Sequence, residues 1–377
     1  MGMHHGTLTG RHARIRAFLV TVAILPACQS QTNLSDTSTC DDVPIAGAGA
    51  DTLVVEGGEG ACTVVFDEVV LLQGSIAGEL PRLPVSSGPD GGWVTATYDP
   101  GRVALWSANG RFRRVIGKGE GGGPGEFIKV SDIVVDAERD RIYIFTVSNR
   151  IEVYDEEGKY LETISLPRYS STGTLMPDGS LIAVLSRAMG EPAFAVVRPD
   201  TVVRWGYSQR GPVFPPLLYG NGENVWTAES AWYEIRRHAS DGRVIGSIKR
   251  ETPDFPEPTK VEVERGAGPL LVAFTVDTDK RRVFALLKQV MKPGHTPPAA
   301  VEAETRLPPA DADQDAYYAG VIEAFDFSGN VLASLRIREG ENVPYPIMSS
   351  GSSGLWYEVL DDDLRSIRIL RPRLEAR

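Results

Sequence analysis

The chain has 377 residues, of which 42% are hydrophobic, so it is long and apolar enough to bury a sizeable core. Its 39 Lys and Arg residues and 50 Asp and Glu residues give a formal net charge of -11. A surface this acidic repels phosphate backbones, which argues against nucleic-acid binding. The charge identifies no partner by itself.

Residues 1–27 have the pattern of a secretory signal peptide. Three basic residues (Arg11, Arg14 and Arg16) precede an apolar run over residues 17–24. This run is too short to cross the ~30 Å hydrocarbon core of a membrane as a helix. The pattern therefore predicts a leader that is removed on export.

The sequence Leu-Pro-Ala-Cys at residues 25–28 resembles the lipobox of bacterial lipoproteins. The resemblance implies that Cys28 becomes the first mature residue and carries acyl chains, so that membrane lipid is a partner. By resemblance to the sorting signals of Gram-negative lipoproteins, Ser30 favours anchoring in the outer membrane, with the protein facing the periplasm. Cleavage without lipidation, which gives a soluble periplasmic or secreted protein, is the alternative.

Residues 28–60 are rich in Ser, Thr, Gly, Asp and Ala, a composition that predicts a flexible tether before a folded domain at 61–377. Cys40 lies in this tether and Cys62 at the start of the domain. With Cys28 acylated, these are the two remaining thiols, and an exported protein meets an oxidising compartment. We therefore predict a Cys40–Cys62 disulfide, with two unpaired cysteines as the alternative.

A repeated unit of short strands joined by two turns recurs through the rest of the chain. Turn pairs such as Asp90-Gly91, Asn109-Gly110 and Asp178-Gly179 separate short apolar runs, which is the pattern of β-hairpins. Six copies at a period of about 40 to 50 residues predict an all-β, six-bladed β-propeller, with seven blades as the alternative count. The fifth copy contains an insertion at 292–315, which we predict to be an extended surface loop.

The last copy contains only three strand-like runs before the chain ends. Residues Thr63 to Gln73 are strand-like but belong to no copy. Because an unpaired strand edge is a liability, we predict that this N-terminal strand supplies the fourth, outer strand of the last blade and closes the ring.

The Gly-rich stretch 117–127 contains the spacing G-x-G-x-x-G, but a strand-like run follows it where a dinucleotide site needs a helix. The stretch ends in Pro-Gly-Glu-Phe and resembles the crossing between blades in NHL-type six-bladed propellers. The resemblance implies that the glycines permit the crossing and that the phenylalanine is buried between blades. Structural roles are thus expected for Gly117, Gly119, Pro124, Gly125 and Phe127.

The sequence contains no recognisable catalytic motif. Only His238 and His295 follow the leader, which is too few for the zinc lyases built on this fold, and His238 is expected to be an exposed turn residue. The acidic triplet 361–363 fits a solvated turn better than a calcium loop. We therefore predict no catalytic residue, metal ligand or cofactor, with calcium as an open alternative.

Aromatic and arginine residues near strand ends are candidate binding residues, because Trp, Tyr and Arg are enriched at binding hot spots. They are Arg150, Arg187, Trp232, Tyr233 and Arg236. Ordinary packing within blades is the alternative. The sequence thus favours a lipid-anchored envelope module that binds a protein, peptide or glycan, or acts as a scaffold. A metal-dependent hydrolase or lactonase with its site in the central channel is the alternative.

Overall fold

The computed structural model describes the chain in segments within the unit Ser38–Arg377. The described residues are 40, 52–54, 62–73, 84–88, 90–97, 101–185, 192–198, 201–208, 216–220, 224–249, 255, 270–288, 290–291, 317–318, 320–327, 331–337, 347–348, 356–359 and 366–376. Cys28, Arg187, His295, the insertion 292–315 and the acidic triplet 361–363 lie outside these residues.

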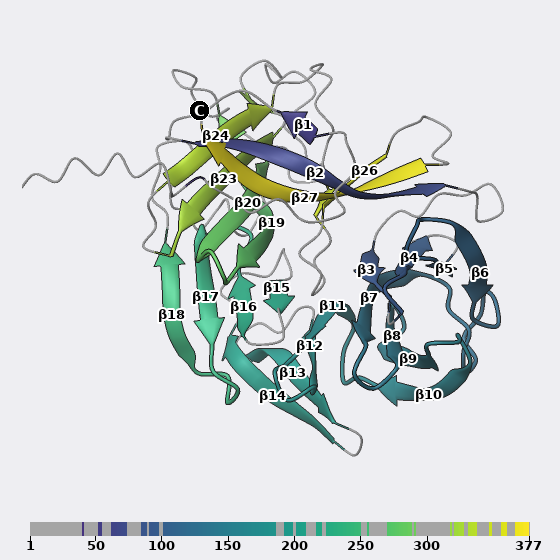
Figure 1. Ribbon diagram of the computed structural model, residues 1–377. Helices are drawn as coiled ribbons and strands as arrows, with labels where there is room; N and C mark the ends of the chain where they lie inside the picture. Colours follow the sequence, from purple (N-terminus) through teal and green to yellow (C-terminus); the bar gives the residue numbers. More distant parts are fainter. Residues whose placement is uncertain are drawn as a thin grey trace, which may run out of the picture. The chain divides into compact units, whose positions relative to one another are not determined.

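Every element among the described residues is a β-strand, and most strands pair with their neighbours in sequence (Figure 1). Blade one contains β3 (Val85–Ser87), β4 (Trp93–Thr97), β5 (Arg102–Trp106) and β6 (Phe112–Ile116). Blade two contains β7 (Val130–Asp136), β8 (Arg141–Thr146), β9 (Arg150–Asp155) and β10 (Tyr160–Ser165). Blade three contains β11 (Ser170–Leu175), β12 (Leu181–Leu185), β13 (Pro192–Arg198) and β14 (Thr201–Ser208).

Blades four and five repeat this antiparallel order. Blade four contains β15 (Leu217–Gly220), β16 (Val225–Ala228), β17 (Glu234–His238) and β18 (Val244–Lys249). Blade five contains β19 (Leu270–Asp277), β20 (Arg282–Lys288), β23 (Gly320–Asp326) and β24 (Val331–Ile337). A small ladder between β21 (Val290–Met291) and β22 (Tyr317–Tyr318) lies at the base of the insertion.

The sixth sheet combines the two ends of the chain. It contains β25 (Ile347–Met348), β26 (Trp356–Val359) and β27 (Ser366–Ala376), followed by β2 (Cys62–Gln73). β2 pairs with β27 from Cys62 opposite Ala376 to Gln73 opposite Ser366. The prediction that an N-terminal strand completes the last blade is therefore confirmed.

A short strand, β1 (Thr52–Val54), adds to the outer edge of β2. It lies within the segment whose composition predicted a tether. Its three residues pair with Val65, Phe66 and Asp67, which covers part of an edge that would otherwise present unpaired backbone groups.

Consecutive blades pack through their inner strands, from β3 to β7, β11, β15, β19 and β25. Blade six also packs on blade one through a shared apolar cluster that contains Leu72, Ile369, Val85 and Trp106. Since each blade contacts the next and the last contacts the first, the fold is an all-β propeller, as the turn pattern predicted.

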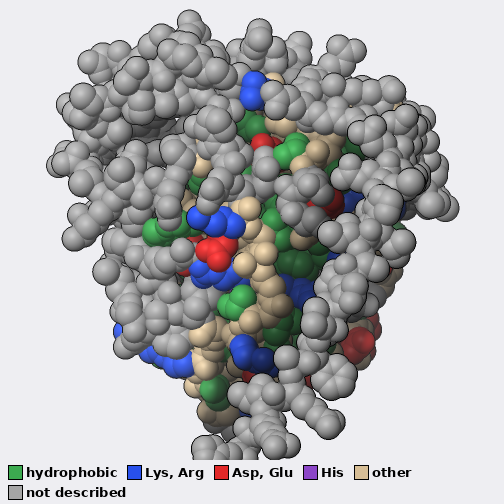
Figure 2. Space-filling view, turned by 90° about the vertical axis from the view of Figure 1, so that its left-hand side faces the viewer, with side chains coloured by type: hydrophobic (Ala, Val, Ile, Leu, Met, Phe, Trp, Pro, Cys, Tyr) green, Lys and Arg blue, Asp and Glu red, His purple; other side chains and the backbone are tan. Residues whose placement is uncertain are grey.

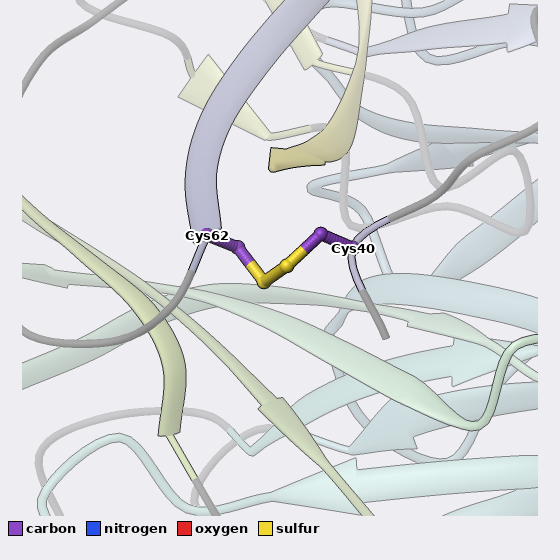
Figure 3. Close-up of a disulfide and its surroundings, with 2 residues drawn as sticks. All are labelled: Cys40 and Cys62. Carbon is purple, nitrogen blue, oxygen red and sulfur yellow. A yellow bond between two sulfur atoms is a disulfide. The ribbon is translucent and has the colours of Figure 1, made fainter. Parts of the chain in front are cut away.

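A disulfide joins Cys40 to Cys62, whose Cα atoms lie 5.7 Å apart (Figure 3). Both residues are buried, and they share an apolar cluster with Val64, Phe66 and Leu374 of the closing strands. The crosslink therefore fixes residue 40 to the first residue of β2, inside the core of the closing sheet.

The expectation that His238 is an exposed turn residue is wrong. Only 3% of His238 is exposed, because β17 extends to this residue and Trp205 of blade three packs against its ring. In the following turn, the residues exposed to solvent are Ser240 and Asp241.

Candidate functional site

The connections of blades one to five fall at two different ends of the sheets. In an antiparallel sheet, the turns after the first and third strands lie at one end, which we call the turn end. The connections after the second strand, and the crossings to the next blade, lie at the opposite end, which we call the loop end.

The described connections at the turn end are short and capped by their own side chains. Asp155 Oδ1 accepts the Lys159 N–H at 2.8 Å, Asp178 Oδ1 accepts the Ser180 N–H at 2.9 Å, and Asp241 Oδ1 accepts the Arg243 N–H at 2.9 Å. Such turns satisfy local backbone groups and serve the fold.

At the loop end, Phe127 anchors the Gly-rich crossing from blade one to blade two. Its ring is 1% exposed and lies 6.4 Å from the ring of Tyr154, edge to face. Gly117 has a φ of +97°, and a Cβ atom there would lie 2.4 Å from Phe127 Cζ. The backbone of Gly125 is bound on both sides: its carbonyl accepts the Tyr154 hydroxyl at 2.7 Å, and its N–H donates to Glu152 Oε2 at 3.1 Å. Gly119 and Pro124 lie on the exposed side of the crossing.

Arg150 lies beneath this crossing. Its Nε lies 2.8 Å from Glu152 Oε1, and the Glu152 side chain is fully buried. The terminal nitrogens of Arg150 donate to the carbonyls of Gly122, of Gly123 at 3.2 Å and of Glu126 at 2.8 Å. The structure thus engages this guanidinium in shaping the crossing.

At the loop end of blade four, Trp232 and Tyr233 lie in the turn between β16 and β17, and Arg236 lies in β17 just after it. The Trp232 N–H donates to the Glu229 carbonyl at 3.0 Å, and the Glu234 N–H donates to the Trp232 carbonyl at 2.8 Å. The Trp232 side chain lies at an intermediate level of burial between these two backbone bonds.

Tyr233 anchors this turn on blade five. It is 4% exposed, packs on Phe255 and Phe325 with ring centroids 5.2 Å and 5.9 Å away, and donates its hydroxyl to Glu323 Oε2 at 2.8 Å. The Ser230 carbonyl accepts the Leu271 N–H at 2.8 Å, which ties the turn to β19.

Arg236 joins two carboxylates below the turn. Its Nε and one terminal nitrogen donate to the two oxygens of Glu234 at 3.1 Å and 2.7 Å, and the other terminal nitrogen lies 3.3 Å from Glu229 Oε1. The Arg236 side chain is 12% exposed, so these charge-assisted bonds are shielded from water. The group Glu229, Glu234 and Arg236, which we call the ion triad, fixes the turn from below.

Of the predicted binding residues, three thus lie at the loop end of blade four, two in the turn and Arg236 in the strand after it. Arg150 lies in a separate blade, and Arg187 lies outside the described residues. Sequence reasoning missed Glu229, Glu234 and Glu323. Glu234 and Arg236 stand two apart on one strand, a spacing that places them on the same face and could have indicated the pair. Glu323 lies 90 residues beyond Tyr233, and no local pattern links them.

Charged and apolar side chains are intermixed on the part of the surface drawn in Figure 2, where hydrophobic residues lie among Lys, Arg, Asp and Glu. Within the described residues, no group of His, Cys, Asp and Glu has the arrangement of a metal site. No described helix has the length and hydropathy needed to cross a membrane.

A family model described as a 6-bladed β-propeller, DUF5128, matches residues 93–196, from Trp93 in β4 to Val196 in β13. No curated protein matches the chain. A solved structure of a Bacteroides fragilis protein described as exported is similar at 13% identity, with a TM-score of 0.53 over 86% of this chain and 98% of the other.

A member of the DUF4221 family from Bacteroides vulgatus is similar at 8% identity, with a TM-score of 0.55 over 87% of this chain and 99% of the other. At such low identity, these two likenesses show the propeller fold alone.

Proposed function

We propose that this propeller is an exported binding module of the cell envelope, that acylated Cys28 anchors it, and that the turn from Glu229 to Tyr233 contacts its partner. Export is supported by the leader and by the description of the similar Bacteroides fragilis protein. The lipobox resemblance supports the anchor, and Ser30 favours the outer membrane.

The observation that carries the binding role is the fixed position of Trp232. Its backbone is bound on both sides, Tyr233 beside it is buried in blade five, and the ion triad lies below. Because the backbone that carries this partly exposed indole is already ordered, little backbone conformational entropy is lost when a partner binds there. Trp in such a setting is the residue type that most often dominates a binding surface.

The partner class is a protein, peptide or glycan, because each presents a surface that a partly exposed indole can contact. Tyr233 supports the turn from within the core, and Arg236 is held by its two carboxylates. We therefore assign the direct contact to Trp232 and the positioning to its two neighbours.

The role of Trp232 is tested by Trp232→Ala in the purified protein, with Arg243→Ala as the matched control. Arg243 is 74% exposed and lies at the turn end of the same blade. Binding of immobilised protein to solubilised envelope extract is measured by surface plasmon resonance. We expect Trp232→Ala to weaken the response about tenfold or more, as loss of a hot-spot residue does, and Arg243→Ala to leave it unchanged. Equal binding by all three proteins, or no binding by the unmodified protein, would refute the proposal.

A further inference from the structure

Blade three lies between two neighbours, and a buried titratable side chain of each neighbour contacts it: Asp132 of blade two and His238 of blade four. We call the contact of blades two and three the Asp132 seam, and the contact of blades three and four the His238 seam. Asp132 is fully buried and His238 is 3% exposed. Neither side chain belongs to the turn that carries the proposed binding role.

At the Asp132 seam, a carboxylate of β7 bonds to β11. Asp132 Oδ2 accepts the Thr172 hydroxyl, and it accepts the Gly173 N–H at 3.0 Å. Asp132 Oδ1 accepts the Ile133 N–H at 2.9 Å. Ser131 reinforces the seam by donating its hydroxyl to the Ser170 carbonyl at 3.2 Å.

At the His238 seam, an imidazole of β17 packs on an indole of β14. His238 Nδ1 lies 3.1 Å from the Gly242 carbonyl, which only accepts, so Nδ1 carries a hydrogen. Nε2 lies 2.8 Å from the Thr227 hydroxyl and accepts from it in the neutral ring. The ring centroid lies 4.8 Å from that of Trp205, whose Nε1–H donates to the Ser240 carbonyl at 3.1 Å.

We propose that the two seams respond to protons with opposite sign, so that acidification tightens blade three against blade two and loosens it from blade four. The chemistry of the two groups gives the signs. A buried carboxylate loses its charge when it takes up a proton, whereas a buried neutral imidazole gains one. Burial penalises the charged form in each case.

The electrostatics of the two sites support these signs. Burial raises the pKa of Asp132 to about 6, against the lowering effect of its three hydrogen bonds. Opening of the Asp132 seam therefore becomes harder as the pH falls from above 6 towards the ordinary value of 3.8. Burial lowers the pKa of His238, against the raising effect of its bond to Gly242. Opening of the His238 seam therefore becomes easier as the pH falls below 6.5.

The charged groups on the described elements around Asp132 come from β7, β8 and the turn between them. β8 places Phe145 opposite Asp132, and its charged residue, Arg141, lies opposite Asp136 at the other end of β7. Asp136 forms an ion pair with Arg139, which also donates to the carbonyls of Asp178 and Gly179 in blade three. β11 has no charged residue.

The strands and the turn that contact the His238 ring carry several charged residues: Glu234, Arg236 and Arg237 on β17, Asp241 and Arg243 in the turn, Arg198 on β13 and Arg204 on β14. Lys249 lies at the far end of β18, and β16 has no charged residue.

The test is hydrogen exchange of the whole protein at about pH 5 and about pH 7.5, corrected for the intrinsic effect of pH and followed in peptides that cover β11 and β14. At the lower pH we expect the equilibrium constant for opening of β11 to fall about tenfold, as the pKa of about 6 for Asp132 implies. We expect the equilibrium constant for opening of β14 to rise. Asp132→Asn should remove the response of β11 and keep that of β14. His238→Gln should do the reverse, so each variant is the control for the other.

A response of the same sign at both seams would overturn the proposal, as would a variant that removes both responses. If either variant fails to fold, the two responses of the unmodified protein still decide the matter, because a general effect of acid moves β11 and β14 in the same direction. A change in the indole emission of Trp205, measured against Trp205→Phe, supplies a second readout of the His238 seam.

Discussion

Two largely buried arginines, each paired with carboxylates, shape the loop end of this propeller. Arg150 bonds to a buried carboxylate and to the carbonyls of Gly122, Gly123 and Glu126, and Arg236 bonds to two carboxylates. A guanidinium is suited to this role because its donors lie in one rigid plane. The same residue type that suggests a binding surface in the sequence is used here, at Arg150, to build a loop.

We expect Arg150→Ala to lower the free energy of unfolding by about 3 to 5 kcal/mol, because it leaves Glu152 buried without the partner that balances its charge. Arg141→Ala is the matched control. Arg141 is 39% exposed and pairs with Glu162, which is 49% exposed, so its loss should cost less than about 1 kcal/mol. Urea denaturation of the two variants measures the difference. Equal losses would show that burial does not set the importance of Arg150.

Sequence reasoning reached some of these residues and not others, for a physical reason. The burial of Phe127 followed from a local motif, since the crossing is made by residues that are adjacent in the chain. His238 was misplaced because its burial depends on Trp205, which is 33 positions earlier and in another blade. The partners of Tyr233 and of Asp132 are likewise distant, and a single sequence does not indicate which distant side chains meet.

At the level of whole elements, β2 is the part on which the closing sheet depends. Asp67 and Glu68 of β2 pair with Arg373 and Arg368 of β27 at 2.9 Å and 2.8 Å. The acidic residues thus lie on one closing strand and their basic partners on the other. Phe66 adds apolar contact, with its ring 5.4 Å from that of Trp356.

We expect removal of residues 62–73 to abolish the cooperative unfolding of the domain, because it exposes one edge of β27 and opens an apolar core that includes Val64 and Phe66. Removal of residues 52–54, which form β1, is the control and should lower the melting temperature by only a few degrees. Scanning calorimetry compares the two. An unchanged transition after loss of β2 would contradict the role of this strand.

The role of β2 was predictable because the last repeat in the sequence lacked a fourth strand, and the strand-like residues 63–73 belonged to no repeat. β1 was not predictable, since three residues in a segment rich in Gly, Ala and Asp give no strand pattern. The strands of blades one to five followed from their turns, where residues such as Asp90 and Asp178 mark the hairpins locally.

At the scale of the whole molecule, the proposed anchor and the propeller are separate units of function. We expect Cys28→Ser to move the protein from the membrane fraction to the soluble periplasmic fraction, because loss of the acyl chains removes their transfer free energy of about 0.8 kcal/mol per buried CH2 group. Fractionation followed by immunoblotting measures this. The circular dichroism and melting temperature of the released protein should be unchanged, and continued tight membrane association would refute lipidation as the anchor.

The pairing of β2 with β27 also orders events in time. Asp67 and Arg373 are separated by 306 positions, so the strand that is synthesised among the first must wait for the strand that is synthesised last. Contacts so distant in sequence are slow to form, since the loop-closure entropy is lost before the contact is gained. A nascent chain with five blades synthesised therefore still has β2 without its partner strand β27. A chain in this state has not yet gained its final stability, which suits the export that we propose, because an exported chain passes through a secretion channel before it folds.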